Sequence, residues 1–498
     1  MPVAATDLGR LNDADRLIQE IARDLGLDYL PQEFDVIPDQ KMLEIMAYGL
    51  PVNYSHWSFG RNFDTERTRY EHGYGVPYEV VFNSDPVRAY IMETNPFVIQ
   101  VLVMAHVYAH NDFMKNNRHF GLSRRDMVTS ASEAAARLRQ YEEDYGLEAV
   151  EKLLDAALAI QWNIDPDAAM HPETEEQERE RLYGWAKTVP QRGAFEDLLP
   201  SKPEASSVEK RLLRLRTPPQ PTVELLGYII EHSPRPLAEW ERDVLGVVRE
   251  QSQYFMPYRR TKIMNEGWAT FWHEKIMQRL FGMKFLDAEA HGIYNLYNAR
   301  VKSHNPRSIN PYLLGHAMFS DIEDRWDKGR FGKEYDENVT ARDRDTWDKK
   351  LGLGRKKLFD VRRTYMDWFF LDEFLTRELM EKLKLYVYLE AEREEVFETV
   401  VAETDWRAVK RLLVQNMMNW GVPRILLVDG NYQGSLQLYL QHSFEGLPLD
   451  EEYCSRTLQY IYTLWGRPVL LETREPKNGS SRSKLYVADG SGIHVRTD

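Results

Sequence analysis

Apolar residues recur at intervals of three and four positions over most of the first 385 residues, which is the spacing of one buried helix face. The segments at 144–160 and 235–255 show this pattern clearly, and proline or glycine separates such segments from their neighbours. The stretch YEVVF at 78–82 is an exception, because its β-branched and aromatic side chains favour a short strand. The pattern therefore predicts a large helical body over residues 1–385.

The pattern changes after residue 385, where short runs of strand-forming residues replace the helical periodicity. Helix-like segments at 405–420 and 450–466 lie among these runs. The sequence VDGNYQGSLQL at 428–438 is typical of a β-hairpin. We therefore expect a mainly α protein with a smaller C-terminal α+β domain over residues 386–498, in which helices cover one face of a sheet.

A helix predicted after Asn95 and Pro96, a capping residue and a favourable first helical residue, is apolar almost all round (FVIQVLVMAHVYAH, 97–110). Such a helix belongs in the protein interior. At about 3.6 residues per turn, His106 and His110 project from the same face, one turn apart. Two buried imidazole groups must find polar partners there or cost folding energy.

A second helix is predicted from Thr261, a capping residue, to Gly282, where it stops. Glu266 and His273 lie nearly two turns apart on this helix and therefore share a face. Gly267 in mid-helix costs about 1 kcal/mol relative to alanine, which is typical of a helix packed closely against a neighbour. A carboxylate and a third imidazole therefore lie on a second buried helix.

The two helices together predict a metal site. His106 and His110 with Glu266 or His273 would form the His₂Glu or His₃ set of a catalytic zinc, which keeps one position open for water. We expect His106, His110 and Glu266 to bind a divalent metal, with zinc favoured, and His273 to be a fourth ligand or an acid/base group. Asp112 could orient His110. In the alternative interpretation the histidines form a metal-free polar network with carboxylates or backbone carbonyls.

The general base of a zinc hydrolase is missing from its usual place. In the H-E-x-x-H motif a glutamate follows the first histidine, but here that residue is Val107. A hydrolytic site would need its base from elsewhere, and the candidates are Glu274, Glu93 and Asp112, none of which the spacing favours. The sequence therefore argues against an ordinary peptidase and leaves metal binding open.

Composition narrows the functional class further. The chain of 498 residues carries a net charge of −14, which argues against a general binder of nucleic acid or anionic membranes. Its single cysteine, Cys454, cannot form an intramolecular disulfide or a multi-cysteine metal site, and fits a reducing compartment. The sequence contains no recognisable signal peptide or membrane-spanning apolar run, so we expect a cytoplasmic protein.

Five long blocks in the helical region carry a family resemblance. They are HWSFGRNF (56–63), ETNPFVIQVLVMAHVYAHNDFMKNN (93–117), YFMPYRRTKIMNEGWATFWHEKIM (254–277), INPYLLG (309–315) and LFDVRRTYMDWFFLDEFLT (358–376). Through these blocks the chain resembles the stage V sporulation protein R (SpoVR) family over roughly residues 30–380, and more weakly in the C-terminal domain. HVYAHND and NEGWATFWH also loosely resemble the glutamate-zincin arrangement, in which a late helix supplies the third ligand.

The SpoVR resemblance implies a cytoplasmic protein that spore formers need for spore cortex assembly and that also occurs in bacteria without spores. Its genes commonly neighbour those of a PrkA-type serine kinase and a von Willebrand factor A-like protein, which implies these two partners and a role in stress response or stationary phase. Two functions stay open. One is a metal-dependent hydrolase acting on a cell-envelope precursor or a protein, and the other is a non-enzymatic scaffold or regulator working with the two partners.

Overall fold

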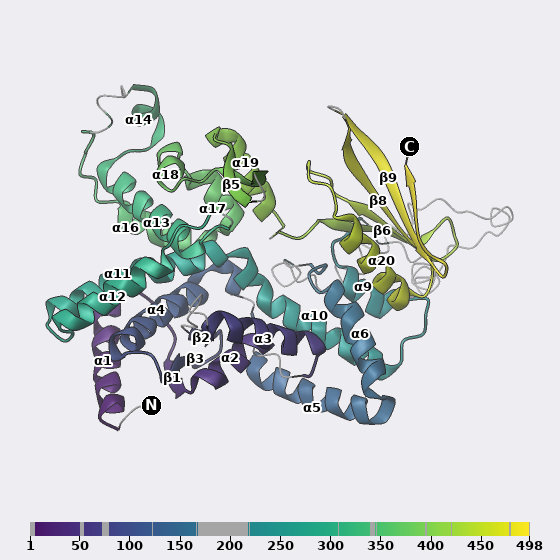
Figure 1. Cartoon of the computed structure of the whole chain (residues 1–498), viewed down its shortest axis with the longest axis horizontal. Helices are drawn as coiled ribbons and strands as arrows, with labels where there is room; N and C mark the ends of the chain where they lie inside the picture. The colour runs from purple at the N-terminus through teal and green to yellow at the C-terminus, as the bar shows by residue number, and fades with distance from the viewer. Residues whose placement is uncertain are drawn as a thin grey trace, which may run out of the picture. The chain divides into compact units, whose positions relative to one another are not determined.

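The computed structural model describes residues 5–49, 54–71, 79–121, 123–165, 167, 218, 220–306, 308–338, 344, 346–393, 396–419, 421–477 and 480–497. Contacts between residues divide the chain into two compact units, whose elements are labelled in Figure 1. Unit 1 comprises Met1–Ser132 and Pro257–Gly421, and unit 2 comprises Glu133–Met256 and Val422–Asp498. Each unit is therefore assembled from two separate parts of the sequence.

Unit 1 is mainly helical. Helices α4 (Phe97–Asn116) and α11 (Lys262–Gly282) lie side by side in it (Figure 1). Helices that contact this pair include α1 (Ala5–Asp24), α12 (Ala288–Val301), α13 (Pro311–Lys328), α16 (Gly354–Thr364) and α17 (Asp367–Phe374). Further helices of the unit are α2 (Asp39–Tyr48), α3 (Trp57–Glu71), the 3₁₀ helix η1 (Arg118–Phe120), α14 (Gly332–Asn338), α18 (Arg377–Lys382) and α19 (Trp406–Met417). All residues of α4 from Val98 to Met114 are buried, as its apolar sequence predicts.

A small sheet in unit 1 is formed by β1 (Gln32–Ile37), β2 (Glu79–Phe82) and β3 (Val87–Met92). The strand order is β1-β3-β2, with β1 parallel and β2 antiparallel to β3, so β2 is an edge strand. Strand β2 confirms the strand predicted at 78–82, of which residues 79–82 are described. Strands β1 and β3 were not predicted, because a run of six residues is too short for periodicity to distinguish it from a helix segment.

Two further strands of unit 1 form a separate ribbon. Strand β4 (Val387–Arg393) pairs antiparallel with β5 (Val396–Glu403) in a two-stranded sheet. The ribbon and α19 were predicted as parts of the C-terminal domain, but contacts between residues assign them to unit 1.

Glycine allows α11 to approach α13 closely. A Cβ atom at Gly267 would lie 2.4 Å from the Cα atom of Gly315 on α13, a separation that Cβ atoms essentially never show. The two helices therefore meet backbone to backbone at this point, which confirms the close packing predicted from Gly267. The contact fixes the part of α11 that carries Glu266.

The N-terminus of α11 is capped from a distant part of the chain. Thr261 occupies the capping position, as predicted, but its side chain makes no capping hydrogen bond. The buried carboxylate of Asp367 instead accepts hydrogen bonds from the backbone amides of Ile263 and Met264, at 2.8 and 2.9 Å. Asp367 thus satisfies two of the amides that every helix leaves unpaired at its start.

Unit 2 combines helices with a five-stranded sheet. Its helices among the described residues are α6 (Leu147–Ala159), α9 (Leu225–His232) and α20 (Glu451–Trp465), while α5 (Met127–Tyr145) and α10 (Glu239–Arg260) contain residues of both units. The sheet has the order β10-β9-β8-β7-β6, and only β7 and β8 are parallel. Its strands are β6 (Ile425–Tyr432), β7 (Gln437–His442), β8 (Val469–Lys477), β9 (Ser480–Asp489) and β10 (Gly492–Thr497). Helix α20, with Cys454 buried on it, packs against β8, β9 and β10, as Figure 1 shows.

These elements confirm the predicted fold class, a mainly α protein with a C-terminal α+β region. The predicted boundary between residues 385 and 386 does not coincide with the division by contacts and stays a prediction. No helix among the described residues combines the length and the apolar character that crossing a membrane requires.

Candidate metal centre

Helix α4 presents two histidines to the interior of unit 1. The side chains of His106 and His110 are buried, and their ring centroids are 4.5 Å apart with the ring planes nearly perpendicular. This spacing is that of residues one helical turn apart, as the sequence predicts. The Nε2 atoms of both rings approach the same carboxylates, at distances of 3.4 to 3.8 Å.

Helix α11 supplies the first of these carboxylates. The Oε2 atom of Glu266 lies 3.6 Å from His106 Nε2 and 3.4 Å from His110 Nε2. The other oxygen, Oε1, accepts a hydrogen bond of 2.6 Å from Lys262 Nζ, one turn earlier on the same helix. Glu266 therefore directs one oxygen to the histidines and the other to a cation.

The second carboxylate comes from strand β2, and sequence reasoning missed it. Glu79 Oε1 lies 3.6 Å from His106 Nε2 and 3.8 Å from His110 Nε2. One ligand atom from each of Glu79, His106, His110 and Glu266 lies within 4.8 Å of the other three. The one available signal was a glutamate in an otherwise apolar strand, YEVVF, and nothing in the spacing related it to the histidine helix.

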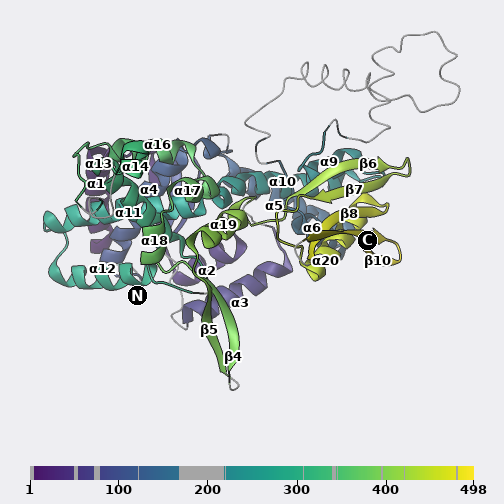
Figure 2. The same cartoon turned by 90° about the horizontal axis from the view of Figure 1, so that it is seen from above.

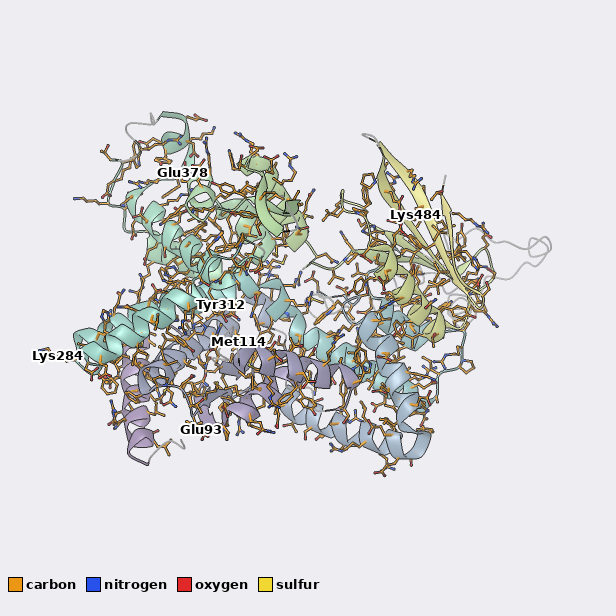
Figure 3. All side chains as sticks on the ribbon, in the orientation of Figure 1. Glu93, Met114, Lys284, Tyr312, Glu378 and Lys484 are labelled. Carbon is orange, nitrogen blue, oxygen red and sulfur yellow. The ribbon has the colours of Figure 1, made fainter. Side chains whose placement is uncertain are left out.

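The second ring nitrogen of each histidine has its own polar partner. His110 Nδ1 lies 2.9 Å from Asn265 Oδ1, and His106 Nδ1 lies 2.8 Å from His273 Nδ1. Partners at the far nitrogen hold the rings of metal-binding histidines in orientation. Tyr312, labelled in Figure 3, adds a stacked ring at 6.0 Å from the His106 centroid. Both imidazoles are thus held with Nε2 directed into the four-residue group.

His273 stands behind His106 and outside the group of four donors. It shares the interior face of α11 with Glu266, as predicted, but it contacts Nδ1 of His106 and not Nε2. Burial, followed by the neighbouring His106, holds the pKa of His273 well below its usual value, so its imidazole is neutral at pH 7. The roles predicted for His273, as metal ligand or acid/base group, stay predictions.

Two atoms of the group are buried without a hydrogen-bond partner in the described part of the chain, namely His106 Nε2 and Glu266 Oε2. Buried polar atoms in native proteins are almost always paired, so an unpaired pair facing one point calls for an explanation such as an ion. Imidazole nitrogens and carboxylate oxygens are the donors that Zn²⁺ takes in proteins. The group of four residues therefore fits a metal ion.

The charges of the group depend on one another. Burial alone would raise the pKa of Glu266, but Lys262 and the two histidines hold it well below its usual value. Burial likewise lowers the pKa of His110, but Glu266 and Glu79 outweigh this and raise it to about 10. Two carboxylates thus attract positive charge to the point between them, which either protons or a metal ion can supply.

Asp112 belongs to a different cluster. Its Oδ1 accepts hydrogen bonds from the Asp28 amide at 2.7 Å and from Arg362 Nη1 at 2.5 Å, and its Oδ2 accepts one from Trp268 Nε1 at 2.9 Å. The hydrogen-bond partner of His110 Nδ1 is Asn265, in the position predicted for Asp112. A catalytic role of Asp112 stays a prediction, and its contacts are those of a structural carboxylate.

The other two candidate bases also lie outside the group of four donors. Glu274 is held by His316 Nε2 at 3.0 Å, by Asn298 Nδ2 at 2.8 Å and by Lys302. Burial raises the pKa of Glu274, but the partners, His316 first, outweigh it and lower the pKa below its usual value. Glu93 directly follows strand β3, and Figure 3 shows it well apart from Tyr312, which stacks on His106. A catalytic role of either residue stays a prediction.

Comparison with known proteins agrees with the resemblance seen in the sequence. Residues 5–422 match the family described as SpoVR like protein, and residues 423–476 match the SpoVR-like C-terminal domain. The chain is 32% identical over 484 residues to the uncharacterized protein YcgB of Escherichia coli (strain K12), covering 93% of this chain and 91% of the relative. No solved structure matches. The family match over most of the length, together with this relative, shows that the chain belongs to the SpoVR family.

Proposed function

We propose that this protein is a metal-dependent enzyme in which His106, His110 and Glu266 bind one divalent cation, zinc by preference, and Glu79 acts as general base. The observation that carries the proposal is the convergence of four donor atoms within 4.8 Å in a buried place, two of them lacking a hydrogen-bond partner among the described residues. A divalent cation bound there would lower the pKa of a bound water to about 7.

Glu79 is the residue best placed to do what the missing motif glutamate does. Val107 follows the first histidine and is apolar and fully buried, so α4 itself supplies no base. Glu79 approaches the two Nε2 atoms from a strand, at 3.6 and 3.8 Å. Of the two carboxylates, Glu266 is fixed by Lys262, whereas the ion pairs of Glu79 are with the histidines alone among the described residues. Glu79 is therefore the carboxylate that no lysine holds in an ion pair among the described residues, which suits the role of general base.

The remaining residues keep the site ordered. Asn265 and His273 hold the far nitrogens of the two histidines, so that each Nε2 is available as a donor. Asp367 fixes the first turn of α11, from which Lys262 and Glu266 project. Burial of the group removes bulk water, which strengthens each charge interaction within it.

The biological setting of this activity is carried over from the family resemblance. We propose a cell-envelope precursor or a protein as substrate, in spore cortex formation where spores are made and in stress or stationary phase elsewhere. A PrkA-type serine kinase and a von Willebrand factor A-like protein are the proposed partners.

One observation favours the second candidate function, a scaffold or regulator for these partners. The β4–β5 ribbon extends from the helices of unit 1 in Figure 2 and pairs with no further strand among the described residues. Leu389 and Val401 on it are exposed to 58% and 49%. An isolated two-stranded ribbon is marginal in water, so a partner that covers it would stabilise it.

The experiment for the metal proposal is the metal content per chain by mass spectrometry on untagged protein. We expect near-stoichiometric metal in the wild type and in Glu79→Gln, and its loss from His106→Ala and Glu266→Gln. Glu274→Gln is the matched control, because it removes a neighbouring half-buried carboxylate outside the group. A folded wild type that is metal-free, and that zinc, manganese and iron fail to stabilise, would overturn the proposal and favour the scaffold.

A further inference from the structure

We propose that Lys262 forms an oxyanion-binding subsite beside the metal centre, so that the substrate carries a carboxylate or phosphate group next to the bond that is attacked. This inference rests on the proposed metal-dependent function and specifies the chemical class of its substrate. It depends on four features of the described residues: the exposure of Lys262, the charge of the group, the hydrogen-bond donors of the lysine, and the way the start of α11 is capped.

Lys262 lies on the solvent-facing side of an otherwise buried group. Its side chain is 60% exposed, whereas that of Glu266, which it contacts at 2.6 Å, is 9% exposed. The side chains of Glu79, His106 and His110 are likewise at most 10% exposed. A substrate that approaches the group from the side of Lys262 would therefore meet its ammonium first.

The charges of the group with a metal bound favour the binding of an anion. Glu79 and Glu266 together balance a divalent cation, and metal-bound histidines are neutral. The ammonium of Lys262 lies at the solvent-facing edge of the group, and its further charged neighbour is Asp367, whose carboxylate is engaged by the first amides of α11. An oxyanion bound there would be attracted by both the ammonium and the metal ion.

Lys262 has the hydrogen-bonding capacity for this role. An ammonium group has three donors on a flexible stem, and the hydrogen bond of Lys262 among the described residues is the one to Glu266 Oε1. The two remaining donors can reach a substrate oxygen while the bond to Glu266 persists. The contact with Glu266 places that oxygen beside the metal ligands.

The start of α11 does not offer an alternative anion site. Helix N-termini attract anions through their unpaired amides, but here Asp367 already accepts from the amides of Ile263 and Met264. The first amides of α11 are therefore not available to an anion, and the proposed site consists of the lysine side chain and the metal.

The test uses full-length protein loaded with Co²⁺, whose visible absorption changes when an anion enters its coordination sphere. Cobalt content is measured first, and the protein is then titrated with acetate and, separately, with inorganic phosphate. We expect both the wild type and Lys262→Arg to bind at least one anion, and Lys262→Gln to bind it about tenfold more weakly or worse. Tighter binding of acetate would assign a carboxylate group, and tighter binding of phosphate a phosphate group.

Lys275→Gln is the matched control, since Lys275 lies on the same helix and forms an ion pair with Glu323 outside the group. It should titrate like the wild type. Identical titrations of wild type and Lys262→Gln, or no anion binding by cobalt-loaded wild type, would overturn the subsite and leave the metal function standing. Loss of cobalt from Lys262→Gln while Lys262→Arg stays loaded would limit Lys262 to holding Glu266, and would also overturn it. A wild type that takes up no cobalt would overturn both proposals.

Discussion

Two buried carboxylate clusters lie on the paired helices α4 and α11, and they differ in whether all of their carboxylate oxygens accept hydrogen bonds. In one cluster, both oxygens of Asp112 accept hydrogen bonds, from Asp28, Arg362 and Trp268. In the other, Glu266 Oε2 and His106 Nε2 have no hydrogen-bond partner in the described part of the chain. The Asp112 carboxylate is fully paired and holds the fold together, and the atom of its cluster that lacks a partner in the described part of the chain is Arg362 Nε. In the other cluster the unpaired oxygen and nitrogen lie 3.6 Å apart and face each other, which is a property of a binding site.

The comparison matters because both clusters look alike in the sequence. Asp112 follows His110 by two residues and was a natural candidate for the site. Burial of an ionisable group therefore does not identify a functional residue by itself. Unsatisfied donors and acceptors that face a common point are the more informative sign.

The largest loss of folding stability should come from removing the carboxylate of Asp112. Asp112→Ala leaves the buried Arg362 guanidinium without its counter-charge, and breaking a buried ion pair in this way costs about 3–5 kcal/mol. Glu79→Gln should destabilise the metal-free protein less, because Glu266 remains as a counter-charge for the protonated His110. Denaturant unfolding of both variants checks this. Equal losses of stability would contradict the distinction between the clusters.

Adding a metal ion should stabilise the folded protein only by binding to the four-residue group. A ligand that binds the folded state at a free concentration of about 100 times its Kd adds about 2.7 kcal/mol, and zinc should do so for the wild type. His106→Ala should abolish the response. His316→Ala is the control, since His316 contacts Glu274 and lies outside the group. Thermal unfolding with and without zinc measures the effect, and a zinc response in His106→Ala would speak against the site.

A smaller effect is expected from the contact that positions α11. Gly267→Ala places a Cβ atom against the backbone of Gly315, and overpacking of this kind costs about 1–3 kcal/mol. Because the helix must shift, zinc affinity should fall as well. Gly282→Ala is the matched control on the same helix, where an added Cβ meets no atom within 4 Å. Unfolding and zinc titration of both variants provide the comparison, and similar results for the two would contradict it.

The last prediction concerns pH, whose effect is the smallest of the four when it is measured over a single pH unit. The pKa of His110 is raised in the folded, metal-free protein from 6.5 to about 10, so its protonation stabilises the folded state. This contribution is fully present below about pH 6.5 and is lost as the pH rises towards 10, by at most about 1.4 kcal/mol per pH unit for one group. Zinc binding should show the opposite trend and strengthen with pH, because it requires the neutral imidazole.

Unfolding of metal-free wild type and His110→Gln between pH 6 and 10 would test this expectation about the folded state. The wild type should lose stability over the range, and the variant should lose less. A parallel loss in both proteins would show that His110 is not the group responsible.

Much of the fold class and part of the site could be predicted from the local pattern of apolar and polar residues along the sequence. The helix with His106 and His110 was recognisable because it is long and apolar, and the metal candidates within one helix follow from 3.6 residues per turn. Glycine at position 267 indicated the close helix contact before its partner was known. The strands β1 and β3 were missed because they are short, and the strand with Glu79 was recognised without its relation to the site.

The sequence alone determined which residues share a helix face, since that depends on residues a few positions apart. Only the tertiary structure decided which faces meet. It brought Glu79 to the two histidines, placed His273 on the far nitrogen of His106, and paired Asp112 with Arg362, 250 residues away. These pairings depend on the packing of distant segments, and the local spacing of residues carries no information about such contacts.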